Sequence, residues 1–135
     1  MSRAGGDLDA LFALAQAAVP TLAGADHVER GLRNAEKLRP QDLPHLFGYE
    51  PRDTSEALPH HRKATTTQYT LLLVTRDETQ EETLLKADAI EDAIDAASTL
   101  GGRVLECRVT DRTLREHPDV VHKGVGFLIT VKRES

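Results

Sequence analysis

The sequence predicts an α+β fold of two layers, in which a small, mostly antiparallel sheet is packed on one face by two helices. Residues 68–76 form an apolar run, and residues 79–100 carry apolar side chains at the spacing of an amphipathic helix. Residues 103–110 and 125–133 alternate between apolar and polar side chains, as strands with one buried face do. These last two segments predict a long β-hairpin at the C-terminus.

The composition is typical of a globular protein, and we expect residues 1–135 to form a single domain with one core. Aromatic residues make up 4% of the chain and tryptophan is absent, so the core must be mainly aliphatic. The net charge of −5 disfavours a surface that coats nucleic acid, since such surfaces are normally basic. The lone cysteine, Cys107, cannot form an internal disulfide, which suits a cytoplasmic setting. The sequence has no apolar run of the roughly 18 residues that a membrane span needs.

The first helix is expected over residues 7–19, with Asp7 as its N-cap and Pro20 ending it. Residues 26–38 fit either a helix or a short strand interrupted by glycine, and periodicity leaves both open. The apolar positions of the first helix are Leu8, Leu11, Phe12, Ala15, Ala18 and Val19.

Residues 43–49 predict a short strand at an edge of the sheet, because Pro44 cannot donate a hydrogen bond to a neighbouring strand. The polar segment 50–64 follows, with two prolines and the pair His60–His61. We expect a surface loop there, and this segment is the best candidate in the chain for one that orders only on assembly.

The second half of the chain begins with a strand over residues 68–76 that is apolar on both faces, which is typical of a central strand. The helix after it opens with Thr79 and Glu82 at the spacing of a capping box and ends at Gly101–Gly102. Its buried stripe is expected to contain Leu84, Ala87, Ile90, Ala93, Ile94 and Ala97. Alternation in the two closing strands places on one face Leu105, Cys107 and Val109, and then Val125, Phe127, Ile129 and Val131.

No pattern in the sequence is typical of a catalytic or metal-binding site. Six histidines occur, but none has the spacing His-x-x-x-His, and one cysteine cannot supply a set of thiolates. We expect Cys107 to be a small core residue and the carboxylates of Glu91, Asp92 and Asp95 to be solvated on a helix surface. Gly124-x-Gly126 precedes a strand, whereas phosphate-binding glycine loops open helices. We therefore expect no enzyme, no cofactor and no metal.

Basic residues gather at two places on this acidic chain. The connector 111–123 holds two arginines, one lysine and two histidines against three carboxylates, and the earlier polar segment holds a second basic spot. Such residues form either a solvated loop or a surface that docks on an acidic neighbour, and the sequence leaves both open. The candidate interface residues are Arg62, Lys63, Arg112, Arg115, His117, His122 and Lys123.

The order of elements resembles the tail terminator, or tail completion, proteins of long-tailed bacteriophages. The resemblance includes the first helix ending at Val19–Pro20, the segment Val28–Leu32 and the segment Asp42–Phe47. It continues through Arg62–Lys63 into the apolar strand Tyr69–Val74, and then through the helix and the closing hairpin. It is a likeness of layout and patterning and includes no active-site motif.

This resemblance implies a structural role in the virion without catalysis. Such proteins form a ring, commonly of six subunits, on the head-proximal end of the tail tube, where the ring stops tube polymerisation and joins the head. The implied partners are other copies of the chain, the tail tube protein and a head-completion or neck connector protein, with DNA passing through the lumen without specific binding. The implied location is the tail or neck of the virion, after assembly in the host cytoplasm and without a membrane. The resemblance also implies that Val28–Leu32 is a strand.

Two other functions stay open from the sequence. Relatives in the phage neck and tail tube share similar small α+β folds, so another neck or connector protein fits the same layout. A small cytoplasmic module that binds a protein or ligand through its loop histidines and closing hairpin fits as well.

Overall fold

The computed structural model of the chain describes residues 3–24, 27–31, 43–60, 62–76, 79–102, 104–116 and 123–134. In chain order the elements are α1 (Arg3–Ala18), the 3-10 helix η1 (Pro20–Leu22), β1 (Val28–Arg30), β2 (His45–Ala57), β3 (Lys63–Thr75), α2 (Gln80–Ala96), β4 (Glu106–Glu116) and β5 (Lys123–Glu134).

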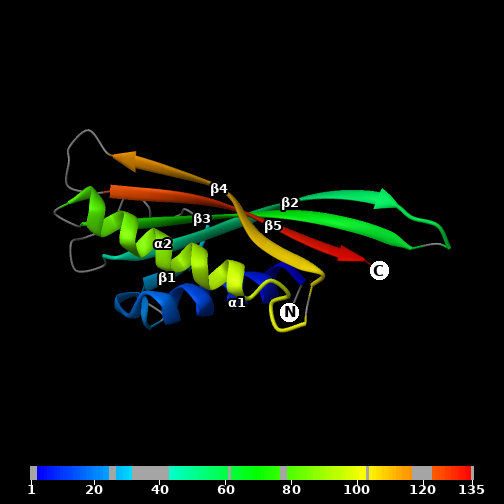
Figure 1. Cartoon of the computed structure of the whole chain (residues 1–135), viewed down its shortest axis with the longest axis horizontal. Coiled ribbons are helices and arrows are strands. Elements are labelled where there is room, and N and C mark those ends of the chain that lie inside the picture. Colours follow the sequence, from blue (N-terminus) through cyan, green and yellow to red (C-terminus); the bar gives the residue numbers. More distant parts are fainter. Residues whose placement is uncertain are drawn as a thin grey trace.

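The described strands form one five-stranded sheet in the order β1-β2-β3-β5-β4. β1 pairs with β2 in parallel, and all other neighbouring strands are antiparallel. Both helices lie on one face of the sheet, and β4 and β5 form the C-terminal hairpin (Figure 1). The predicted α+β fold of two layers is therefore confirmed.

The core lies between the helices and one face of the sheet. Every second residue from Thr67 to Thr75 in β3 and from Lys123 to Val131 in β5 points into it, because side chains alternate between the two faces of a strand. The predicted inward face of the last strand is confirmed, since all four of its apolar side chains are buried. The largest core contributions come from Leu11, Leu22, Leu46, Tyr69, Leu71, Leu73, Ile90, Ile94, Phe127 and Ile129.

The second helix begins where the sequence predicts but ends earlier. The Thr79 hydroxyl accepts a hydrogen bond of 3.2 Å from the Glu82 amide, as expected of a capping box. The helix ends at Ala96 with Ala97 as its C-cap, and Leu100 and the two following glycines then adopt positive φ angles in the turn that follows. Leu100 is thereby turned into the core, where 5% of it is exposed.

Asp7 does not cap the first helix, which begins four residues earlier at Arg3. The side chain instead lies fully buried where α1 meets β3 and β5. Its carboxylate accepts a hydrogen bond of 2.6 Å from the Tyr69 hydroxyl and pairs with the Arg133 guanidinium. Both partners lie far from Asp7 in the sequence, whereas the prediction of an N-cap considers only neighbouring residues. The predicted capping role of Asp7 is wrong for this reason.

The expected loop over residues 50–64 is wrong, since most of this segment belongs to β2 and β3. Their pairing continues from Arg52 opposite Gln68 to Ala57 opposite Lys63, and β5 pairs with β3 as far as Ala64. Five of these twelve pairing residues are Thr or Ser and most of the others are charged or polar, so the segment gives no apolar alternation. This part of the hairpin, residues 52–60 and 62–68, is called the hairpin arm below. It reaches past both helices along the long axis of the molecule (Figure 1).

The connector predicted between the last two strands, residues 111–123, is also longer than the one in the structure. β4 runs to Glu116 and β5 begins at Lys123, with a bulge between Val109 and Asp111 that shifts the alternation of side chains. Leu105 precedes β4 and is 62% exposed, so it does not share the buried face of Cys107 as expected.

For the segment after residue 26, the sequence left both a helix and a strand open. The structure has a strand there, β1, as the resemblance implies. Leu32 lies outside the described residues. β1 covers β2 only from Leu46 to Gly48, so no described strand pairs with the outer edge of the hairpin arm. The edge position expected for the strand after Pro44 is wrong, since Leu46–Gly48 pair with β1 on one side and with β3 on the other.

Replacing Asp7 with Asn is expected to cost about 3–5 kcal/mol of the free energy of unfolding, because it leaves the Arg133 charge largely buried without its counter-ion. Asp9→Asn is the matched control, since Asp9 also pairs with an arginine, Arg30, but about half exposed. We expect that control to cost less than about 1 kcal/mol. Urea denaturation measures both, and equal losses would contradict the structural role of the buried pair.

Gly48→Ala is expected to cost about 1–3 kcal/mol, because the added Cβ would lie 2.6 Å from Cζ of Phe12 and 3.0 Å from Cδ2 of Leu71. Gly126→Ala provides the control on the same sheet. Its Cβ would meet nothing nearer than the Thr113 carbonyl oxygen at 3.9 Å. Thermal unfolding compares the two, and Phe12→Leu should restore part of the loss in Gly48→Ala.

Candidate assembly interface

The structure separates the two groups of basic residues that the sequence assigns to an interface. Arg62 and Lys63 lie at the turn of the hairpin arm, while Lys123 pairs with Thr75 at the opposite end of β3. The twelve steps along β3 from Lys63 to Thr75 correspond to about 40 Å. The two groups therefore cannot form one surface within a single copy.

At the β4–β5 end, the described side chains are engaged within the fold. Nη1 of Arg112 lies 2.7 Å from Oδ1 of Asp88, which ties β4 to α2. Lys123 is buried. The backbone of Arg115 is part of β4, opposite Gly124. The two predicted interface histidines, His117 and His122, lie outside the described residues.

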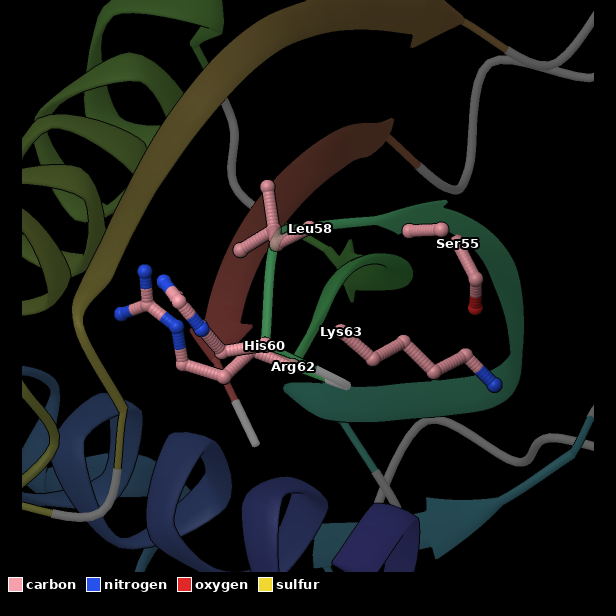
Figure 2. A pocket seen from close by; sticks show the side chains of 6 residues that line it. Ser55, Leu58, His60, Arg62 and Lys63 are labelled. Carbon is pink, nitrogen blue, oxygen red and sulfur yellow. The ribbon is translucent and has the colours of Figure 1, made fainter.

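At the other end, the turn of the hairpin arm encloses a hollow of about 740 Å³ (Figure 2). The turn is closed by a hydrogen bond of 2.9 Å from the Leu58 amide to the Arg62 carbonyl. His60 has a φ of +63°, a left-handed conformation that reverses the chain in few residues. The hollow is lined by Ser55, Ala57, Leu58, His60, Arg62 and Lys63.

The hollow presents nitrogen donors. Arg62 pairs with Glu134 at the end of β5, and its Nε also donates to the Pro59 carbonyl at 3.4 Å. Neither Lys63 nor His60 has an ion-pair partner within the described part of the chain. Glu56 pairs across the arm with Ala64, one residue out of step with Lys63, so its side chain lies on the opposite face.

The sheet face that carries no helix has a smaller hollow of about 330 Å³ between β2 and β4. Half-buried Tyr49, Leu72 and Leu128 lie along it, with Asp111 and Thr113 at one side. Sequence analysis did not identify this hollow, although the apolar residues on both faces of β3 were a signal. A central strand can have its second face half covered by its neighbours rather than by another layer.

Cys107 lies in the core beneath the helices, as expected. Burial raises the pKa of its thiol to about 11, and the charges of Asp7 and Asp95 act in the same direction. Burial also raises the pKa of Tyr69, with a further contribution from its bond to Asp7. Both groups therefore stay neutral at physiological pH and contribute to packing.

The described residues contain no cluster of three or more His, Cys, Asp or Glu side chains that could hold a metal ion. None of their helices combines the length and apolarity that crossing a membrane requires.

The Cys107 thiol is expected to resist a thiol-specific reagent at pH 8 in the native protein and to react fully in denaturant. A pKa of about 11 leaves only about a thousandth of the thiol ionised at pH 8, and the thiolate is the reacting form. Labelling should accelerate as the pH rises toward 11 while the fold persists. Native labelling as fast as that of a free thiol would contradict a buried Cys107.

No protein-family model matches the chain, and no curated protein matches it. Solved structures do. One is a chain in the structure described as the virion of a native gene transfer agent particle, with a TM-score of 0.66 and 12% sequence identity. The match covers 100% of this chain and 100% of that one. The chain therefore shares its fold, from end to end, with a component of a virion particle.

Proposed function

We propose that this chain is a structural protein of a phage-like virion. The observation that supports this most directly is the correspondence of its entire fold with a chain of the gene transfer agent virion. We assign no catalytic role, because the buried thiol and carboxylate of the core are engaged in packing and pairing.

Within that class, the proposed role is that of a tail terminator. Copies of the chain form a ring, commonly of six, on the head-proximal end of the tail tube, which ends polymerisation and presents the surface for a neck or head-completion protein. The resemblance in the order of elements supports this assignment. The hairpin arm supports it too, because it carries backbone and side chains beyond the helices, where a neighbouring subunit can contact them (Figure 1).

The charge of the chain fits a conduit for DNA. Six copies at −5 each would carry about −30, which disfavours adhesion of DNA to the ring. The edges of the sheet offer further contacts, since neither the outer side of the hairpin arm nor that of β4 is paired within the described residues. A ring requires that such contacts be heterologous, so that each copy uses two different surfaces.

Light scattering tests the ring directly. We expect a discrete species near six times 14.8 kDa over a wide range of protein concentration. A monomer at every concentration would limit the proposal to a protein that assembles only on its tube.

Electron microscopy of particles from a strain lacking this chain tests the terminator role itself. Expected are tail tubes of excessive and variable length, together with filled heads that carry no tail, and the wild-type chain supplied in trans should restore joined particles. Tails of normal length joined to heads would overturn the proposed function.

A further inference from the structure

The outer edge of the hairpin arm carries backbone groups that point away from the sheet. The Leu58 amide donates to the Arg62 carbonyl, so these two residues form a hydrogen-bonded pair of the hairpin. In an antiparallel ladder such pairs alternate with pairs whose amides and carbonyls point outward. Since the register is unbroken along the arm, the outward groups of β2 belong to Asp53, Ser55 and Ala57. No partner for these groups lies within the described residues.

The other outer edge of the sheet, that of β4, is closed by side chains. The Val109 amide donates to Oδ1 of Asp95 on α2 at 2.9 Å, and the Arg112 amide donates to Oδ1 of Asp111 at 2.8 Å. The bulge in β4 lies between these amides and disrupts the ladder there. Such features protect an edge from pairing with another strand. The arm has no bulge beyond the one at its base, so its edge stays open to a further strand.

Prolines bound the open stretch of the arm on both sides. Pro51 precedes it and Pro59 follows it, and proline has no amide hydrogen to donate. An added strand can therefore use three outward residues of β2, with Ser55 in the middle. The same stretch of a second copy matches these limits. When two such stretches run antiparallel with Ser55 opposite Ser55, each Pro51 lies opposite a Pro59 and every outward group between them finds a partner.

We infer that two copies of this chain associate by antiparallel pairing of their hairpin arms, edge to edge, about a two-fold axis at Ser55. Asp53 of each copy then pairs with Ala57 of the other, and Thr54 lies opposite Glu56. The exposed Glu56 thus faces a threonine and not a second carboxylate, which would be destabilising directly across a pair of strands. The sheets of the two copies join into one continuous sheet.

The fold leaves room for this pairing. β1 lies along the same edge of β2, but only at Leu46–Gly48, and the arm reaches past both helices (Figure 1). In the register centred on Ser55, the turn of one arm begins at Pro59, opposite Pro51 of the second copy. The turn therefore ends before it reaches β1 of that copy.

This contact is isologous, because both copies use the same edge. It is therefore different from the contact between neighbours in a ring, which needs two different surfaces. The inference does not rest on the proposed function. It predicts that the smallest assembly of this chain in solution is a pair of copies.

Removing one outward amide tests the contact. Ser55→Pro deletes an amide hydrogen that faces the open edge and leaves the hydrogen bonds between β2 and β3 in place. Ser55→Ala is the matched control, since it shortens the same side chain but keeps the amide. At concentrations low enough to dissociate larger assemblies, sedimentation should show the wild type and the control as pairs near twice 14.8 kDa. Ser55→Pro should associate at least tenfold more weakly, and thermal unfolding should show that it is folded.

A cross-link tests the register without the use of proline. Thr54 of one copy and Glu56 of the other form a pair without mutual hydrogen bonds, whose Cα atoms lie about 4.5 Å apart, within the range that a disulfide spans. An equimolar mixture of Thr54→Cys and Glu56→Cys should therefore form the mixed disulfide on mild oxidation. Either variant alone should cross-link far less, because its own cysteines lie diagonally, about 7–8 Å apart. The native Cys107 is buried and does not take part.

Three results would overturn the inference. One is a wild type that is monomeric at every concentration. Another is association of folded Ser55→Pro as strong as that of the wild type, which would place the contact between copies elsewhere. The third is a mixture of the two cysteine variants that cross-links no more than either variant alone. Microscopy of the tails tests the proposed function separately, so either proposal can fail without the other.

Discussion

The buried contact among Asp7, Tyr69 and Arg133 holds the two layers of this protein together. A carboxylate without access to water requires a cation and hydrogen-bond donors, and here they come from β3 and from the end of strand β5. The hydrogen bond that Arg133 donates to Asp7 also raises the pKa of the Arg133 guanidinium, which keeps the pair charged. The next residue, Glu134, points to the opposite side and pairs with Arg62 at the turn of the hairpin arm. Two consecutive residues of β5 thus connect the helical layer to the far end of the arm.

The elements that sequence analysis located well are those whose stability comes from apolar burial. The alternation of Val125, Phe127 and Ile129 and the spacing of Ala87, Ile90 and Ile94 both result from one face meeting a common core. These patterns depend on local sequence, so they can be recognised without knowing the partner. The capping box at Thr79 is similarly local, since its donor and acceptor are three residues apart.

What sequence analysis missed depends on pairing across long separations. The strands of the hairpin arm are held by the pairing of β2 with β3 and of β3 with β5, and no hydrophobic pattern indicates this pairing. Asp7 resembles a cap until its partners 62 and 126 residues away are known. The candidate site had the same limit, because Arg62 lies at the turn of the hairpin arm whereas Arg112 lies midway along β4, opposite Phe127. Only the strand register distinguishes a residue at an arm's turn from one paired with α2.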